Sequence, residues 1–560
     1  MCKRKRILAG LLCLLLCCMP AMAEVTTDVG GFVDDGGQIV DPGMDPEGGF
    51  VTDETQFYTE DSTGLGTDTY APATDIKDAD LRIGYVSGTM AQMNPLFCNE
   101  RDLVSMNQLV FESLVELDEN YKPVPLLANN WEHQDTSWVF TLRSGITFHN
   151  GAELTAYDVQ NSYDAFVMQD RNPYSSRLKL LVEDLKAIDE HTVAVKAKYS
   201  GYMTLYALTF PVLHSMTLND EFPRGTGPYW YVRYELDHAV RIEANPLWWK
   251  QAPTLQSVAF CYYPEISQAL EGLQTGQIDM LSTRSPTAAL NRKLSNVTSM
   301  DYGTSTYEML LPNLSSSSVM SDVRIRKAVM YAIDRAVLAS NAYLDMAIQS
   351  EVPVLPGSWL YESQSAKYYY SPERALQLLY ECGWEDLTGD TMLNKLDGIR
   401  VEELKVNIIT YNDSTSSVRE KAAQAIAGNL NAVGIVTTVS VLSREGMVDR
   451  LESGDYDLAL VGVNLSEVPV LQPLLHSDGS LNMNGHSNEE IDTLIAKSAV
   501  ADDEASLKQI YSQLQLLVVE QLPIMGLLFR TGTVLSTRSM GGMSGIRELE
   551  TFRGLEYLME

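Results

Sequence analysis

Residues Ser321–Arg335 read SDVRIRKAVMYAIDR, and this stretch decides the fold more than any other part of the chain. Ser321 and Asp322 are both residue types that cap the N-terminus of a helix. The apolar side chains that follow recur every three or four residues, which places them on one face of a helix. They are Ile325, Ala328, Val329, Ala332, Ile333 and Ala336. The pattern predicts an amphipathic helix with one face against a hydrophobic core.

The same stretch resembles the DVRxRxAxxxAIDR signature of extracellular solute-binding protein family 5, the peptide-, dipeptide- and nickel-binding receptors of ABC importers. Further segments resemble this family in the family's own order over roughly residues 79–560. Motifs in one order rarely arise together by chance. The segments are LVFESLVELDENYKPVPLLANNWE from Leu109, WVFTLRSGITFHNGAELTAYDV from Trp138, GTGPYW from Gly225, ANPLWWKQAPTLQSVAF from Ala244, LEGLQTGQIDML from Leu270, VLPGSWLY from Val354, YSPERALQLLYECGW from Tyr370 and HSDGSLNMNGHSNEEIDTLI from His476.

The first 23 residues have the pattern of a secretory signal peptide. Basic residues 3–6 precede an apolar run at 7–18, and Ala21-Met22-Ala23 has the A-x-A form of a cleavage site. We expect cleavage after Ala23 and an exported bacterial protein, in the periplasm or on the extracellular face of the cell membrane. A lipid anchor on Cys17 or Cys18 is the alternative, although the preceding residues differ from the usual Gly, Ala or Ser.

Residues 24–77 are rich in Asp, Glu, Gly and Thr, and Lys77 is their only basic residue. Such a composition cannot bury a core, so we predict a disordered acidic linker, either a tether spacer or a solvated tail. The whole chain has a formal net charge of −33, and the folded part is acidic too. This charge argues against nucleic-acid binding, which needs basic patches.

The rest of the chain alternates strand and helix patterns, which predicts an α/β fold with a largely parallel sheet in its second half. The resemblance implies a two-lobed, periplasmic-binding-protein-like (type II) fold with an extra subdomain in the first lobe. The predicted divisions are lobe I at 78–118, 222–310 and 529–560, the inserted subdomain at 119–221, and lobe II at 311–528.

The resemblance also implies that the chain crosses to the second lobe near Tyr307–Asn313 and returns near Pro523–Arg530. Two crossings make a hinge, and a solute held between the lobes shifts the equilibrium toward their closed arrangement. The function implied is a receptor that captures a small solute, a peptide first of all, and delivers it to the permease subunits of an ABC transporter. A peptide sensor for signalling and a secreted hydrolase are the alternatives, and we expect a monomer.

Three segments after predicted strands are candidates for the ligand site, because ligands of α/β sheets bind beyond the carboxyl ends of the strands. Asn94 follows the first strand and offers an amide. Arg284 follows the strand QIDML and can pair with an anionic group. Asn464 follows the strand DLALV. Trp359, in a Pro-Gly turn, can supply apolar contact or core packing.

The segment at residues 462–467, Gly-Val-Asn-Leu-Ser-Glu, departs from the family pattern. Peptide binders of the family usually have G-W-x-A-D-Y there, and the Asp receives the ammonium group of the peptide. In this chain Val463 stands in place of the Trp and Ser466 in place of the Asp, while Glu467 is one residue further on. Asn464, Ser466 and Glu467 are the candidate contacts, with capping of the next element as the alternative role of Asn464 and Ser466.

Metal and catalytic motifs are not evident, so we predict no cofactor, no metal and no enzyme. His476 and His486 are read as loop structure, as is His149 in the FHNG turn. Cys98, Cys261 and Cys382 are far apart and odd in number, which indicates neither a disulfide framework nor a zinc site.

Overall fold

The structure is a computed structural model. It describes residues 78–86, 93–170, 172–199, 201–235, 239–285, 288–411, 418–465 and 468–559, together with the backbone of 32–33 and 39–40. The predicted signal peptide lies outside the described residues, as does most of the predicted linker. Within the described part of the chain, no helix is long and apolar enough to cross a bilayer.

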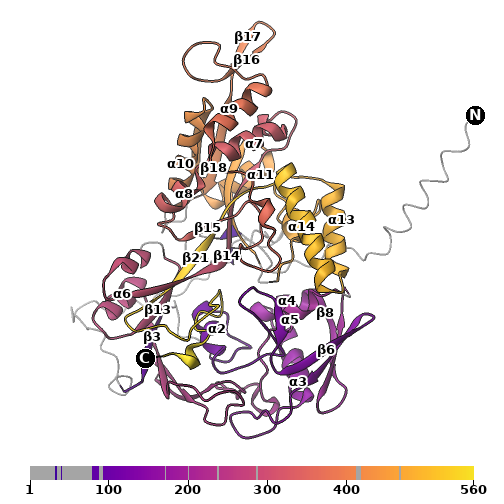
Figure 1. Cartoon of the computed structure of the whole chain (residues 1–560), viewed down its shortest axis with the longest axis vertical. Coiled ribbons are helices and arrows are strands. Elements are labelled where there is room, and N and C mark those ends of the chain that lie inside the picture. The colour runs from indigo at the N-terminus through magenta and orange to yellow at the C-terminus, as the bar shows by residue number, and fades with distance from the viewer. Residues whose placement is uncertain are drawn as a thin grey trace, which may run out of the picture.

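The molecule has two lobes joined by two long strands, β14 (Thr298–Pro312) and β21 (Met525–Ser536) (Figure 1). Both strands belong to one mixed sheet, which also supplies strands to each lobe. In lobe I the sheet order is β10-β11-β12-β3-β13-β21. These elements are β3 (Leu81–Val86), α2 (Arg101–Asn107), β10 (Tyr229–Glu235), β11 (Ala239–Ala244), β12 (Ser257–Tyr263), α6 (Ile266–Gln274) and β13 (Met280–Thr283).

A separate four-stranded sheet in the order β6-β7-β9-β8 lies beside lobe I, and we call this region the insert. It contains β6 (Ala128–Gln134), β7 (Ser137–Leu142), α3 (Ala156–Val167), α4 (Pro173–Leu181), β8 (Val182–Ala187), β9 (Thr192–Ala197) and α5 (Thr204–Ala207). The small hairpin β4 (Val115–Leu117) and β5 (Pro123–Pro125) leads into it. Helix α3 begins with a capping box formed by Thr155 and Asp158.

Lobe II contains three parallel strands in the order β19-β18-β20, and β20 pairs with β14 in antiparallel fashion. The expectation of a largely parallel sheet therefore holds for these three strands only, because the two strands that join the lobes run antiparallel. Lobe II comprises α7 (Val323–Ala332), α8 (Arg335–Asn341), β15 (Ala347–Gln349), α9 (Pro372–Glu381), β16 (Asn394–Asp397), β17 (Arg400–Glu403), β18 (Lys405–Tyr411), α10 (Val418–Ala432), β19 (Val436–Leu442), α11 (Arg444–Ser453), β20 (Leu458–Asn464), α12 (Gln472–Leu475), α13 (Glu489–Val500) and α14 (Glu504–Gln521).

The signature stretch forms two helices where the sequence predicted one. Asp322 caps α7 by accepting a hydrogen bond from the backbone N–H of Arg324, as predicted. The helix ends at Ala332, because Asp334 caps a second helix, α8, through the N–H of Val337. The apolar stripe continues across this break, and for that reason the sequence pattern does not reveal it.

The arginines of the signature hold lobe II together. Arg326 is buried and donates to the carbonyls of Met320 (2.6 Å) and Gln521 (2.7 Å), so it ties the start of α7 to the end of α14. Arg335 donates to the buried carboxylate of Glu351 at 2.7 Å. These contacts give a physical reason for the arginine spacing of the signature.

Several of the other quoted segments meet around the buried carboxylate of Glu112. It accepts hydrogen bonds from the Thr226 hydroxyl (2.9 Å), the Trp248 indole (3.3 Å) and the Trp249 indole (2.8 Å). Burial raises the pKa of Glu112, and Lys250 at 3.8 Å opposes that shift. The resemblance in these segments therefore reflects a shared packing junction in lobe I.

Two strands of two residues each lie within the predicted linker. β1 (Phe32–Val33) pairs with β2 (Ile39–Val40), and Phe32 also lies opposite Val463 of β20 in antiparallel register. The disorder predicted for residues 24–77 stays a prediction.

The cysteines agree with the sequence analysis. Cys98, Cys261 and Cys382 are buried free thiols. Burial raises the pKa of Cys98 and of Cys261 to about 12, so both thiols stay protonated at neutral pH.

Candidate ligand site at the strand crossing

The two crossing strands are irregular where they pass from one lobe to the other. Pairing between β14 and β21 shifts register between Gly303 and Tyr307 and again between Glu308 and Met309. Glycine on β21 lets two tyrosine rings lie across the strand: a Cβ on Gly532 would be 2.2 Å from the ring of Tyr302, and a Cβ on Gly526 would be 1.8 Å from the Tyr307 hydroxyl. The crossing is thus a local bend packed with aromatic side chains.

A buried ion cluster lies at this bend. Glu308 of β14 is fully buried and binds two arginines from different elements. Arg419 at the start of α10 donates through Nε (3.1 Å) and Nη2 (3.0 Å), and Arg530 of β21 donates through Nε at 2.7 Å. One carboxylate therefore links both crossing strands to a helix of lobe II.

The two arginines of this cluster stabilise the ionised form of Glu308. Burial alone would raise the pKa of Glu308, but Arg419 and Arg530 together hold it below its usual value. The guanidinium of Arg419 also lies 4.7 Å from the centre of the Tyr411 ring, and that of Arg530 lies 5.5 Å from the Tyr343 ring. Glu308 is therefore ionised at neutral pH.

A second charged group lies in lobe I. Arg284, after β13, forms an ion pair with Glu548, and Arg101 at the start of α2 is 4.0 Å from the same carboxylate. Arg101 also pairs with Asp102 at 3.1 Å. Burial, reinforced by the neighbouring Arg101, lowers the pKa of Arg284 to about 9. Arg284 is thus a largely desolvated cation whose charge is balanced by Glu548.

The carboxyl end of β20 completes the candidate site. Asn464 is nearly buried, and its side-chain oxygen accepts from Thr306 Oγ1 (3.1 Å) and Ser305 Oγ (3.3 Å) of β14. On the opposite edge, β18 pairs with β20 only at Leu458 and Ala459. Backbone pairing between the two parallel strands ends there, near the carboxyl ends of the strands, where α/β sheets bind ligands.

The other predicted site residues have different surroundings. Asn94 is fully buried, and its amide is engaged inside lobe I: Nδ2 donates to the carbonyls of Leu218 (2.8 Å) and Asp220 (2.9 Å), and Oδ1 accepts from the N–H of Leu96. Ser466 and Glu467 lie outside the described residues. Their contact with ligand stays a prediction, as does that of Asn94.

Trp359 lies in a contact between lobe II and the insert. Its indole N–H donates to the hydroxyl of Tyr206 at 2.7 Å, its ring meets that of Tyr202 edge-on at 5.9 Å, and its backbone N–H donates to the carbonyl of Asn120 at 2.8 Å. Nearby, Lys122 pairs with Glu504 at 2.7 Å. We call this contact the bridge. It lies away from the crossing strands, where α14 approaches α4 and α5 (Figure 1).

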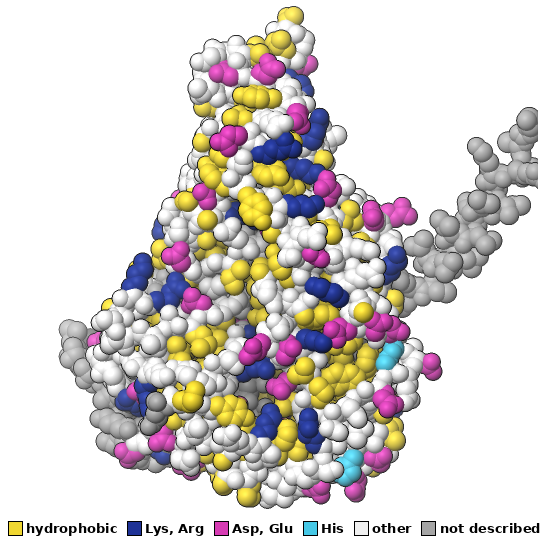
Figure 2. Space-filling model, in the orientation of Figure 1, with side chains coloured by type: hydrophobic (Ala, Val, Ile, Leu, Met, Phe, Trp, Pro, Cys, Tyr) yellow, Lys and Arg dark blue, Asp and Glu magenta, His cyan; other side chains and the backbone are white. Residues whose placement is uncertain are grey.

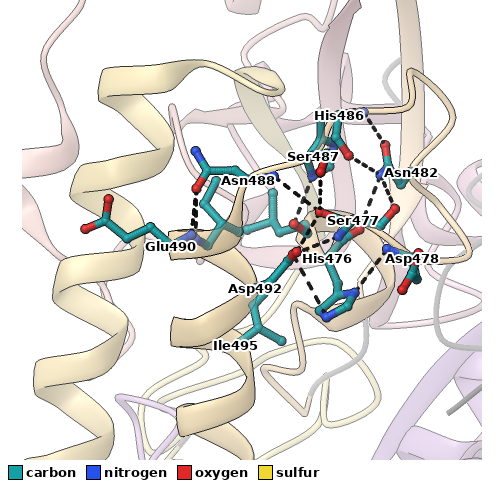
Figure 3. A network of polar contacts seen from close by, with 12 residues as sticks. His476, Ser477, Asp478, Asn482, His486, Ser487, Asn488, Glu490, Asp492 and Ile495 are labelled. Atoms are coloured by element: carbon teal, nitrogen blue, oxygen red, sulfur yellow. Dashed lines mark hydrogen bonds and ion pairs between the residues drawn. The ribbon is translucent and has the colours of Figure 1, made fainter. Parts of the chain in front are cut away.

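The histidines take structural positions, as expected. His486 Nε2 is 2.8 Å from the carbonyl of Leu475, and His476 Nδ1 accepts from the N–H of Asp478 at 3.0 Å (Figure 3). Asp492 accepts from both the N–H and the hydroxyl of Ser477 in the same network. His149 Nε2 is 3.1 Å from the carbonyl of Gly227. In the part of the chain that the structure describes, His, Cys, Asp and Glu form no group arranged to hold a metal ion.

Sequence reasoning missed Glu308, Arg419 and Arg530. Glu308 interrupts the apolar run YEMLL, and Arg530 follows the apolar run LLF. A charged residue inside a predicted buried strand is the signal that could have found them, because charges are rarely buried without a partner.

Charged side chains of both signs are interspersed over the face shown in Figure 2. Lys and Arg do not gather there into one basic patch, and Asp and Glu lie among them where the upper and lower parts of the molecule meet (Figure 2).

Comparison with protein families identifies a match at residues 122–484, more than half of the chain. The matching family model describes the middle part of the bacterial extracellular solute-binding proteins, family 5. Among curated proteins, the oligopeptide-binding protein AppA of Bacillus subtilis (strain 168) is 24% identical over 471 residues, which cover 79% of this chain and 85% of that protein. The heme-binding protein A of Haemophilus influenzae is 22% identical, over 74% of this chain and 81% of that protein.

Solved structures share the fold. A crystal structure described as a nickel ABC transporter from Bacillus halodurans superimposes with a TM-score of 0.72 at 20% identity, covering 84% of this chain and 98% of that chain. The unliganded open form of the periplasmic murein tripeptide-binding protein MppA gives a TM-score of 0.72 at 18% identity, covering 84% and 95%.

Proposed function

The chain belongs to the bacterial extracellular solute-binding proteins, family 5, and from this premise we propose that it captures a peptide between its two lobes and delivers it to the permease of an ABC transporter. Relatives carry names for oligopeptides, dipeptides, haem and nickel. The family is one of binding receptors, and we propose that this member has no enzymatic activity. We further propose that it acts as a monomer on the outer side of the cell membrane. A lipid anchor at Cys17 or Cys18 is the alternative to cleavage after Ala23.

The observation that carries the choice of a peptide is the edge of β20. Backbone pairing with β18 ends at Ala459, and the edge of β20 beyond that point is proposed to pair with an extended chain. Main-chain pairing gives affinity that does not depend on ligand side chains, which suits peptides and gives a metal ion or haem no comparable advantage.

The surrounding charges suit the two ends of a peptide. Arg284 and Arg101 are proposed to attract the carboxylate, with Glu548 giving up part of its pairing with Arg284. Asn464 is proposed to orient the backbone at the end of β20, and Glu467 to receive the ammonium group in place of the aspartate that the family usually has. Trp359 is proposed to act in closing, through the bridge.

Closure would use the crossing strands as the hinge. A peptide that touches both lobes binds the closed arrangement better than the open one, and its differential affinity shifts the equilibrium. A preference of about 5.5 kcal/mol would convert a 1:99 ratio of closed to open molecules into 99:1.

Isothermal titration calorimetry on the purified exported protein tests the proposal. The panel comprises di- to pentapeptides with free termini, the same peptides with N-terminal acetylation, nickel with histidine, and haem. We expect binding of free-amine peptides alone. Binding of nickel-histidine or haem, with every peptide inactive, would overturn the peptide proposal while leaving the receptor class intact. Native mass spectrometry of the protein as purified would identify a solute retained from the cell.

A further inference from the structure

Strand β20 has different partners on its two edges. Its inner edge pairs with β14 from Leu458 to Asn464. Its outer edge pairs with β18 at Leu458 and Ala459, and Thr410 Oγ1 still reaches the carbonyl of Leu460 at 3.1 Å. Further along, the outer edge is met by β1, whose Phe32 lies opposite Val463. A segment from the N-terminal region of the chain therefore extends the sheet at the candidate ligand site.

We propose that the paired strands β1 (Phe32–Val33) and β2 (Ile39–Val40) are an occupant built into the chain, with β1 pairing to the outer edge of β20 and competing with the solute for it. The competition rests on the proposed function, whereas the pairing itself does not. The segment thereby serves as an internal pseudo-ligand that keeps the edge covered until solute displaces it.

The sequence of the segment suits this role. Two pairs of β-forming apolar residues, Phe32-Val33 and Ile39-Val40, flank the turn-forming sequence DDGGQ. The two pairs lie side by side in antiparallel register, with Phe32 opposite Val40 and Val33 opposite Ile39. A pair of antiparallel strands this short is marginal by itself in water, and joining a larger sheet supplies the missing pairing. Addition of a strand to an open edge is also the way in which many proteins recognise extended peptides.

Covalent attachment favours the internal occupant over a free peptide of the same sequence. Because both partners belong to one chain, the local concentration of the segment at the edge does not depend on the protein concentration. If the segment covers the edge in nine of ten molecules, the apparent affinity for solute falls about tenfold, since only the uncovered fraction is competent to bind.

A disulfide between the facing positions tests the pairing directly. Directly opposite residues of antiparallel strands have Cα atoms roughly 4.5 to 5.5 Å apart, which is within the range that a disulfide bridges. The double variant F32C/V463C is prepared in the full exported chain. Its control is T52C/V463C, in which the cysteine of the predicted linker is at position 52 instead of position 32. Cys98, Cys261 and Cys382 are buried and do not compete. We expect an intramolecular disulfide in the first variant, seen by non-reducing electrophoresis and peptide mapping, at several times the yield in the control.

Equal yields in the two variants, or a disulfide that joins two molecules, would overturn the proposal. Calorimetry with the peptide panel then separates it from the proposed function. We expect the oxidised F32C/V463C variant to bind no peptide and the reduced one to bind. A disulfide without peptide binding in either state would retain the pairing and reject the peptide receptor. Peptide binding by a variant that forms no disulfide would retain the peptide receptor and reject the pairing.

A second variant leaves the folded lobes unchanged. F32P/V33P removes backbone donors from β1, because proline has no N–H, and T52P/D53P is its matched control. Deuterium uptake of fragments that cover β20 should rise in F32P/V33P and stay at the wild-type level in the control. Affinity for peptides should rise about tenfold if the segment is bound in nine of ten molecules. Unchanged uptake over β20 in F32P/V33P would show that β1 does not cover this edge.

Discussion

At the residue scale, Glu308 is the polar group of the candidate site that links both crossing strands to lobe II. Its carboxylate is fully buried at the bend of β14 and is shared by Arg419 of lobe II and Arg530 of the returning strand. A buried ion pair gains little over apolar packing, but removal of one partner leaves the other charges without compensation. Glu308 is therefore expected to fix the geometry of the crossing rather than to add net stability.

Substitution Glu308→Gln should lower the free energy of unfolding by about 3 to 5 kcal/mol, because two buried guanidinium groups would lose their counter-charge. Chemical denaturation at pH 7 measures this loss. Glu452→Gln, on the exposed side of α11, is the matched control and should change the free energy of unfolding by less than about 0.5 kcal/mol. Equal stability of Glu308→Gln and wild type would contradict the role assigned to the cluster.

The same pair of proteins should respond differently to acid. The pKa of Glu308 is depressed in the folded protein, so its ionised form contributes stability above 4.5, its ordinary value, and that contribution is lost as pH falls through the lowered folded-state value. The stability difference between wild type and Glu308→Gln should therefore be constant from neutral pH down to about pH 5 and shrink below it. A difference that shrinks between pH 8 and pH 6 would point to another group.

Glu467 is the second residue with a distinct expectation. A peptide ammonium group without a carboxylate partner suffers a desolvation penalty of several kcal/mol. If Glu467 receives this group, Glu467→Gln should weaken binding of free-amine peptides by roughly 2 to 5 kcal/mol, and N-acetylated peptides should bind poorly to both proteins. Calorimetry measures both, with the exposed Glu489→Gln as control. Tight binding unaffected by Glu467→Gln would remove Glu467 from the site.

Residues of the candidate site were predictable from the sequence only where a simple rule applied. Arg284 and Asn464 follow predicted strands, and the rule that ligands bind beyond strand ends selected both as candidates, whose contact with ligand stays a prediction. The partner of Glu308 could not be found in this way, because Arg419 is 111 residues away in sequence and only the fold brings them together. Asn94 follows the same rule as Arg284, yet its amide is engaged by neighbouring carbonyls of lobe I.

At the element scale, local signals for helix ends were reliable and the continuity of helices was not. Ser371 caps α9, Pro372 begins it, and Gly383 follows its end with a positive φ of 83°, which are the residue types that mark helix ends in a sequence. The signature stretch differs, because the apolar stripe from Ile325 to Ala336 has helical spacing throughout while Asp334 starts a new helix within it. Periodicity reports which face is buried, and it does not report whether the backbone turns between two helices that share that face.

The bridge offers a test between elements. Burial raises the pKa of Tyr206 well above its usual value, so its hydroxyl stays protonated, donates to the carbonyl of Tyr121 at 3.1 Å and accepts from Trp359. A double-mutant cycle of Trp359→Phe, Tyr206→Phe and the combined variant should give a coupling energy of about 0.5 to 1.5 kcal/mol. The free energies come from chemical denaturation. A coupling energy of zero would mean that the hydrogen bond is absent in solution.

At the scale of the whole molecule, the two-lobed architecture was predictable because ordered motifs cover nearly all of the exported chain. The expected crossings near 307–313 and 523–530 coincide with β14 and β21. The bridge was not predictable, because it depends on how far lobe II leans toward the insert, and sequence patterns carry no information on the angle between lobes. Similarly, the antiparallel course of the crossing strands follows from their long-range pairing rather than from any local pattern.

A bound peptide should compact the molecule and stabilise it. Small-angle X-ray scattering should show a smaller radius of gyration with saturating peptide than without it. The free energy of unfolding should rise by about 2.7 kcal/mol when free peptide is at a hundredfold excess over Kd. The two measurements are made on the same sample, so that stabilisation verifies binding. Stabilisation without any change in scattering would contradict a receptor that closes.

The bridge has a consequence for the lifetime of a complex. Lobe II is attached to the rest of the molecule at the crossing strands and again at Trp359, whose indole donates to Tyr206 of the insert. Release of a bound solute would then require the second attachment to break as well, so the residence time would depend on the bridge in addition to the contacts of the solute. Loss of the bridge would then shorten the residence time of every ligand by a similar factor, while the differences between ligands would remain.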